Sequence, residues 1–197
     1  MNNIKKHWWK ILTVLILLYV FVVGLLAPLS TGIEAVTPQS LKTGSVFEME
    51  IVGYNTHFTE AKEPIRAWLE IDSAHAICSD IIRIIDDTHL EAAFTIPNTI
   101  PNNEPIVYTT LILNSDVDGS AIMPSAASVT IDSSAEQNKA TWSSCLVSQL
   151  YSNDQYDFPY RNILGETIRN LYFHVPMWFG MMFILLASVI ASIKYLR

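Results

Sequence analysis

The sequence predicts a membrane α plus all-β protein, in which two transmembrane helices flank one external β-sandwich. Three observations lead to this prediction. Half of the 197 residues are hydrophobic, and they concentrate in two blocks, residues 8–26 and 173–193. The segment between the blocks alternates apolar and polar residues as strands do. All 19 acidic residues of the chain lie in that segment.

Each apolar block is long enough to cross a bilayer. The blocks have 19 and 21 residues, and a helix of that length spans about 30 Å, the thickness of the hydrocarbon core. Neither contains Asp, Glu or Arg, and Lys10 lies near enough to the start of the first to reach the interface. The first block could instead be a cleaved signal peptide. Its core is longer than a signal core and "LLAPLSTG" offers no clean small-x-small cleavage site, so we favour an anchor.

Positive charge predicts the orientation of both helices. Lys5, Lys6 and Lys10 flank the first helix, and Lys194 and Arg197 follow the second. The positive-inside rule therefore places both termini in the cytoplasm. The segment between the helices then lies outside. It carries 7 basic and 19 acidic residues, a net charge of −12.

The middle segment predicts strands in three clear places. "VFEMEIV" alternates apolar residues with glutamates, and "LEAAFTI" and "IVYTTLIL" alternate in a similar way. Turn sequences such as "TPQSLKTG", "IPNTIPNNEP" and "NSDVDGS" separate these stretches. Short strands with regular turns predict an all-β sandwich over residues 29–131, a length that suits one such domain.

The rest of the chain divides around this sandwich. Residues 1–28 hold the cytoplasmic N-terminus and the first helix. Residues 132–172 are expected to form a linker that ends in an amphipathic helix on the membrane surface, with the sequence "ILGETIRNLYF". Residues 173–197 form the second transmembrane helix.

The two cysteines of the chain, Cys78 and Cys145, both lie in the external segment. A disulfide between them is compatible with an oxidising compartment and would close a long loop. Two unpaired buried thiols are the alternative, and the spacing in the sequence leaves both open.

The middle segment shows no motif of a self-contained active site. His57, His75 and His89 lie in different predicted elements without metal-ligand spacing, so we expect ordinary strand or surface residues. Asp86–Asp87 and the "DVDG" of residues 116–119 are expected to form turns, because they lack the further oxygen ligands of a calcium loop. No nucleophile motif, phosphate loop or pair of catalytic carboxylates is present.

His174 is the candidate binding residue, at the outer mouth of the second predicted helix. Pro176 suits the first turn, whose free N–H groups and dipole disfavour a positive imidazole. A neutral imidazole exposes a lone pair, as a heme iron or another metal requires. Trp178 and Tyr172 would supply an aromatic wall. The alternative is an interfacial histidine among aromatic residues that mark a bilayer boundary, and the residues alone favour this alternative.

Two stretches of the middle segment, "GIEAVTPQSLKTGSVFEMEIVGYNTHFTE" and "DDTHLEAAFTIP", resemble the opening of an immunoglobulin-like domain of the IPT/TIG type. The matching residues are Val36, Pro38, Gly44, Gly53, Asn55, Phe58, Leu90, Ala92, Phe94, Ile96 and Pro97. The resemblance implies an immunoglobulin-like sandwich, a fold that serves mostly as a binding or spacer module.

The C-terminal block "TIRNLYFHVPMWFGMMFILLASVIASIKYL" resembles the start of the second membrane helix in the heme-handling proteins of cytochrome c biogenesis, the CcmC/CcsA family. The motif "RNLYFHVPMW" carries most of this resemblance, and the first 28 residues are loosely similar to the first helix of that family. The resemblance implies that His174 is an axial ligand to heme at the outer membrane face. It also implies that heme passes to a carrier or directly to apocytochrome c.

The sequence departs from that family in two ways. The family fold has six or more membrane helices, a tryptophan-rich outer segment and a second histidine farther along. This chain ends at Arg197, after the second predicted helix, and it carries a sandwich where the family has a short outer loop. We therefore expect an N-terminal piece that is truncated or split from the remaining helices.

The predicted function is that of a membrane component of cytochrome c maturation, handling heme rather than catalysing a reaction. We expect it in the bacterial inner membrane with a periplasmic sandwich. His174 would bind heme, and Trp178 and Tyr172 would line its edge. The expected partners are lipid, the remaining helices or other assembly subunits, and a heme carrier or apocytochrome c, without nucleic acid. The alternative is a twice-anchored surface binding or scaffold protein without heme.

Overall fold

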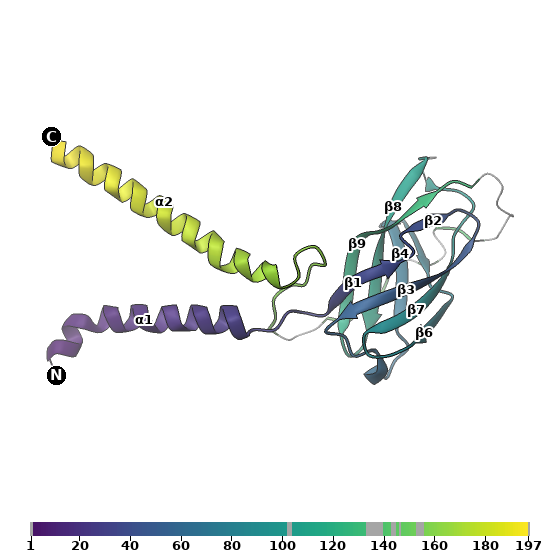
Figure 1. Ribbon diagram of the computed structural model, residues 1–197, viewed down its shortest axis with the longest axis horizontal. Coiled ribbons are helices and arrows are strands. Elements are labelled where there is room, and N and C mark those ends of the chain that lie inside the picture. The colour runs from purple at the N-terminus through teal and green to yellow at the C-terminus, as the bar shows by residue number, and fades with distance from the viewer. Residues whose placement is uncertain are drawn as a thin grey trace. The chain divides into compact units, whose positions relative to one another are not determined.

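The computed structural model describes residues 2–101, 104–132, 140–142, 145, 147–152 and 156–196. The chain divides into two compact units. The helical unit comprises Met1–Leu29, Tyr156–Pro159 and Leu164–Arg197, and the sandwich unit comprises Ser30–Gln155 and Tyr160–Ile163. Figure 1 shows the two long helices of the first unit and the strands of the second.

Two long apolar helices lie at the ends of the chain, as predicted. α1 spans Asn2–Leu26 and α2 spans Ile168–Leu196. The segments His7–Leu26 and Gly165–Leu196 are long and apolar enough to cross a membrane. A helix satisfies its backbone N–H and C=O groups internally, which an apolar surrounding requires.

α2 begins earlier than the sequence indicated. The separate interfacial helix expected before residue 173 is wrong, because the short 3-10 helix η3 (Gly165–Thr167) leads directly into α2 at Ile168. Residues 168–175 contain no glycine or proline, so nothing there ends a helix. Pro176 therefore lies inside α2 and not in its first turn. There it lacks the N–H that would otherwise donate a hydrogen bond to the carbonyl of Tyr172.

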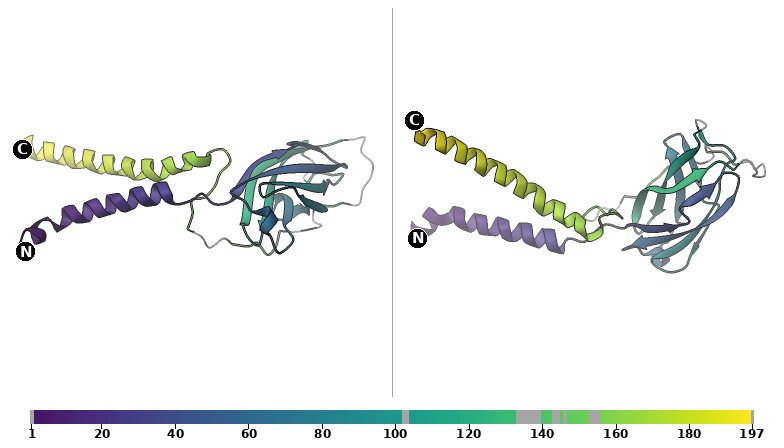
Figure 2. Two further views of the ribbon diagram at one scale, coloured as in Figure 1. Left: turned by 60° about the horizontal axis from the view of Figure 1, so that its bottom comes forward. Right: turned by 45° about the horizontal axis from the view of Figure 1, so that its top comes forward.

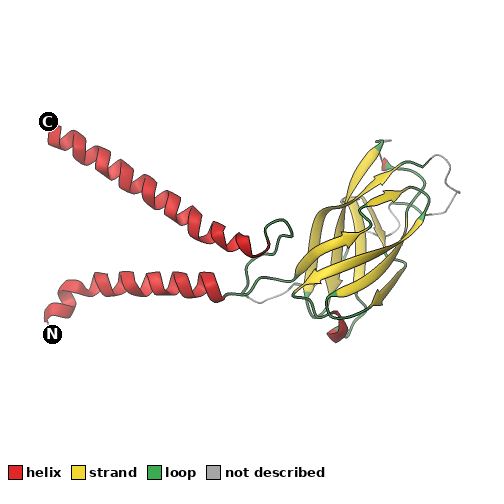
Figure 3. Cartoon of the chain, in the orientation of Figure 1, coloured by secondary structure: helices red, strands yellow, loops and turns green. Residues whose placement is uncertain are grey.

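The sandwich unit consists of two β-sheets packed as two layers (Figures 2 and 3). The first has the strand order β1-β3-β7-β6 and the second the order β2-β9-β8-β4-β5. Every neighbouring pair is antiparallel except β2 and β9, which are parallel. The bounds are Gly32–Thr37 (β1), Ser40–Lys42 (β2), Val46–Tyr54 (β3), Arg66–Asp72 (β4), His75–Cys78 (β5), Ile81–Ile84 (β6), His89–Thr95 (β7), Ile106–Ser115 (β8) and Gly119–Thr130 (β9), with the short 3-10 helix η1 at Phe58–Glu60.

The core lies between the two sheets. Met49 of β3 lies opposite Ala92 of β7, and Ile51 lies opposite Leu90, and all four side chains are fully buried. The second sheet contributes its own buried residues, among them Leu69, Leu111 and Val129. The strands predicted in "VFEMEIV", "LEAAFTI" and "IVYTTLIL" are confirmed as β3, β7 and β8.

The residues that follow β9 differ from the expected linker. Trp142 is buried in the core, where its indole Nε1–H donates to the carbonyl of Thr99 over 2.8 Å. Cys145 forms a disulfide with Cys78, with the two Cα atoms 5.6 Å apart. We call the described residues of 140–152 the strap, because these contacts hold them on the sandwich.

The strap explains why the second half of β8 is buried on both faces, where alternation predicted one solvated face. The fully buried Asn114 donates from Nδ2 to the carbonyl of Gln149 over 3.2 Å, and its Oδ1 accepts from the N–H of Tyr151 over 2.7 Å. Arg66 donates to the same carbonyl of Gln149 over 2.8 Å. Asn114 and Arg66 bond to backbone groups of the strap, which nearly every residue type offers. The sequence of the strap therefore does not reveal these contacts.

We expect the Cys78→Ser, Cys145→Ser double variant to lose about 4 kcal/mol of unfolding free energy at most, because the disulfide joins residues 67 positions apart and restricts the unfolded chain. Guanidinium unfolding of the full chain in detergent, followed by tryptophan fluorescence, measures this loss. Ser79→Ala, beside Cys78, is the control and should unfold like the wild type. Equal midpoints for the double variant and the control would contradict the prediction.

Candidate functional site

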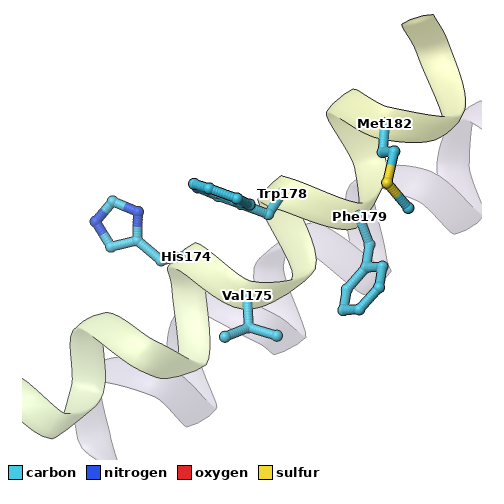
Figure 4. A pocket seen from close by; sticks show the side chains of 5 residues that line it. All are labelled: His174, Val175, Trp178, Phe179 and Met182. Atoms are coloured by element: carbon cyan, nitrogen blue, oxygen red, sulfur yellow. The ribbon is translucent and has the colours of Figure 1, made fainter.

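One face of α2 carries the candidate binding residue. His174 and Trp178 are one helical turn apart, so their side chains leave the helix on the same side (Figure 4). They line a hollow of about 330 Å³ together with Val175, Phe179 and Met182. Trp178 is 72% exposed. The hollow is thus an apolar surface on a single helix, and the imidazole of His174 lies at it.

Tyr172 does not belong to this face. Its ring meets the rings of Phe158 and Phe173 edge-on, with 5.3 Å between centroids in each pair. A Cβ atom on Gly24 of α1 would collide with both Tyr172 and Phe173, so these rings pack against α1. The structure brings together His174 and Trp178 of the three predicted site residues, and it places Tyr172 in the contact between the helices.

The position of His174 also removes one argument made from the sequence. The free N–H groups of a helix belong to its first turn, and the effect of the dipole falls off within that turn. His174 is preceded by Ile168–Phe173 in the same helix. The N-terminal N–H groups of α2 therefore do not act on the imidazole, and the expectation based on them was wrong.

Arg169 connects the start of α2 to the end of α1. Its Nη1 donates to the carbonyl oxygens of Ala27, over 2.5 Å, and Gly24, over 3.3 Å. Its Nε donates to Glu166 over 2.7 Å, and its guanidinium carbon lies 5.4 Å from the ring centroid of Phe158. Sequence reasoning assigned no role to Arg169. The absence of a basic residue from the last turn of α1 is the signal that could have suggested one.

Three histidines of the sandwich each form a hydrogen bond with an aspartate. The Nδ1–carboxylate pairs are His57–Asp118 at 3.1 Å, His75–Asp72 at 2.8 Å and His89–Asp86 at 3.0 Å. Within the described part of the chain, no group of three or more His, Cys, Asp and Glu side chains is arranged to hold a metal ion. Each of these histidines is thus the partner of a carboxylate, and His75 and His89 are the first residues of β5 and β7.

Asp86 organises the connection from β6 to β7. Its Oδ1 accepts hydrogen bonds from the backbone N–H groups of Thr88 and His89, both over 2.7 Å. The hydrogen bond from the Thr88 N–H, and then the one from the His89 side chain, lower the pKa of Asp86 from 3.8 to about 2. Asp118 of "DVDG" similarly accepts from the N–H of His57 over 3.0 Å. Asp86 thus makes the local contacts of a turn residue, whereas Asp118 connects its turn to a residue 61 positions away.

The comparisons with known proteins do not identify a family. No protein-family model matches the chain, and no curated protein matches it. Among solved structures, the chain is similar to a superoxide reductase (neelaredoxin) from Ignicoccus hospitalis, with 8% sequence identity and a TM-score of 0.32. That likeness covers 56% of this chain and 86% of the other. It is too distant to carry an argument about function.

We expect Asp86 to stabilise the sandwich in a pH-dependent way. Its pKa is lower in the folded chain, so its contribution is complete above the unfolded value of 3.8 and disappears as the pH falls through about 2. Thermal unfolding of the full chain in detergent should show Asp86→Asn below the wild type at pH 6, with the gap narrowing toward pH 2. The exposed Glu63→Gln is the control. A gap that does not depend on pH would contradict the assignment.

We expect Arg169→Ala to weaken the contact between the helices, because it leaves the carbonyl of Gly24 in α1 and that of Ala27, just after α1, without this donor. Hydrogen bonds from charged groups suggest a loss of about 2 kcal/mol. Loss of helical circular dichroism in detergent, as the fraction of dodecyl sulfate is raised, measures this loss. Arg161→Ala, at an exposed arginine outside the contact, should resemble the wild type. Identical curves for the two variants would exclude a structural role for the Arg169 contact.

Proposed function

We propose that α1 and α2 anchor the chain in a bacterial inner membrane, with the sandwich on the outer side and both termini in the cytoplasm. Lys5, Lys6 and Lys10 in the first part of α1, and Lys194 at the end of α2, support this orientation. The Cys78–Cys145 disulfide supports it independently, because disulfides persist in oxidising compartments such as the periplasm.

We further propose that the sandwich is immunoglobulin-like. The order β1-β3-β7-β6 corresponds to strands ABED of that fold, and β9-β8-β4-β5 corresponds to GFC with an added edge strand. The short parallel pairing of β2 with β9 fits a first strand that changes sheets. The disulfide differs from the one in antibody domains, because it joins β5 to the strap instead of joining the two sheets.

On this frame, we propose that the protein handles heme in cytochrome c maturation and passes it to a carrier or to apocytochrome c. The observation that carries the proposal is the α2 face, where His174 offers an imidazole beside Trp178 in an apolar hollow. Heme is the cargo, and its iron would accept the imidazole as an axial ligand. Trp178 would contact the flat macrocycle. Tyr172 has no part in this site, because it packs against α1.

The α2 face fits one side of a heme, so a second wall has to come from elsewhere. The hollow, at about 330 Å³, lies at the lower end of the range for ligand sites, and such sites usually bury most of their ligand. Within the part of the chain that the structure describes, only residues of α2 line it. We propose that further helices of the same family fold, or another assembly subunit, cover this face and supply the second iron ligand.

The competing function is a twice-anchored binding or scaffold protein without heme. Two features favour it. The sandwich unit has its own hydrophobic core, and a disulfide joins the strap to β5, so protein groups alone account for its packing. The two functions differ in one measurable property, which is the binding of heme through His174.

We expect the full chain in lipid nanodiscs to bind ferric heme with a shifted Soret band. Replacement of residues that merely orient a metal ligand costs about 10–100-fold in affinity, so His174→Ala should weaken binding at least about tenfold. His7→Ala, at the start of α1, is the matched histidine control and should leave the spectrum unchanged. No binding by the wild type, or equal binding by both variants, would favour the scaffold function.

A further inference from the structure

The edges of the two sheets are protected unequally. An edge strand exposes unpaired N–H and C=O groups to other chains, and proteins usually block such edges. The edge strands here are β1, β6, β2 and β5. β1 has an irregular register between Ile33 and Ala35, and β2 is three residues long and ends in Lys42. The strap covers part of β5, where the N–H of Ala76 donates to the carbonyl of Trp142.

β6 is also short, at four residues, and carries Arg83, but it has a regular register, and no strand in the described part of the chain pairs with its outer side. It pairs regularly with β7 along one side and lies at the end of its sheet. The N–H of Ile85 donates to the carbonyl of His89, which makes the odd-numbered residues the hydrogen-bonded ones of this antiparallel ladder. The N–H and C=O groups of Ile82 and Ile84 therefore point away from β7, toward the open edge.

The side chains along this edge are mostly apolar. Ile81, Ile84 and Ile85 are 68%, 41% and 52% exposed. The charged side chain of β6, Arg83, forms an ion pair with Glu91. A cleft of about 450 Å³ adjoins the strand, and the residues that line it include Ile81, Ile82, Ile84, Pro64, Trp68 and Cys145. The open backbone edge and an apolar cleft thus lie next to each other.

We propose that β6 binds an extended polypeptide segment of a partner protein. The segment pairs with the open edge as an added strand and places an apolar side chain in the cleft, a mode in which the backbone gives affinity and the alternate side chains give specificity.

Charge complementarity indicates that this segment carries lysine or arginine. A second hollow along β6 is lined by Glu48, Glu91 and Arg83, so acidic side chains outnumber basic ones there. The whole segment between the two apolar blocks has a net charge of −12. In the cleft itself, Asp80 and Arg66 carry opposite charges, so the acidic balance comes from the hollow and from the segment as a whole. The inference is independent of heme, because all of these residues lie in the sandwich unit.

A labelled synthetic peptide of alternating valine and lysine tests the proposal with the full chain in lipid nanodiscs. A peptide of alternating valine and glutamate is the matched control, because it keeps the strand propensity and reverses the charge. We expect the lysine peptide to bind at least about tenfold more tightly. Equal binding of the two peptides, or no binding of the lysine peptide, would overturn the proposal.

Variants of Ile84 separate pairing at the edge from attraction to an acidic surface. Ile84→Pro removes the outward N–H without a change of charge, and it should weaken binding of the lysine peptide about tenfold. Ile84→Val keeps the N–H and should bind like the wild type. Ile84→Lys keeps the backbone and adds a positive charge, so it should also weaken binding, whether or not the proline variant folds.

Undiminished binding by both Ile84→Pro and Ile84→Lys would overturn the proposal. The proposal would also be overturned if the wild type formed a dimer and bound no peptide, and if Ile84→Lys converted that dimer to a monomer. That result would assign the edge to a second copy of this chain.

Discussion

The chain leaves α1, forms a sandwich and returns to α2, so its outgoing and returning segments have to run side by side. Leu29 forms a parallel bridge with Phe158, whose N–H donates to the carbonyl of Pro28 over 2.8 Å. Two residues farther along, the N–H of Tyr160 donates to Oγ of Ser30 over 2.8 Å. These hydrogen bonds fix where the chain returns. The start of α2 can therefore meet the end of α1, and the other contacts of the helical unit follow from that meeting.

The first consequence concerns the carbonyl groups that end α1. Such groups have no partner within their own helix. α1 has no basic residue in its last turn, and Arg169 of α2 supplies the donor. Tyr172 and Phe173 then pack over Gly24. Because this contact occupies one side of α2, the side that carries His174 and Trp178 stays available for another partner.

Sequence reasoning predicted the elements whose residues follow a repeating pattern, and it missed those whose position depends on single side-chain or backbone contacts. β3 and β7 follow the alternation because every second side chain enters the core. The strap depends on single contacts, such as the indole of Trp142 and the carbonyl of Gln149, which leave no period in the sequence. The start of α2 was misplaced because hydropathy marks where a span becomes apolar, whereas a helix continues until a residue breaks it. With one continuous helix, two positions differ by about 200° around the axis, so Tyr172 and His174 point in nearly opposite directions.

The histidines show what the candidate site still requires. A histidine that binds a metal usually donates its other ring N–H to a carboxylate or carbonyl, which fixes the tautomer and the orientation of the ring. His57, His75 and His89 have such a carboxylate, but they belong to the sandwich unit. His57 follows β3, and His75 and His89 are the first residues of β5 and β7. His174 lies on an apolar hollow, yet none of the hydrogen bonds of the described residues involves its ring. The orienting partner and the hollow occur at different histidines in this chain. Under the proposed heme function, the group that covers the α2 face would bring both the second wall of the site and the acceptor that orients His174.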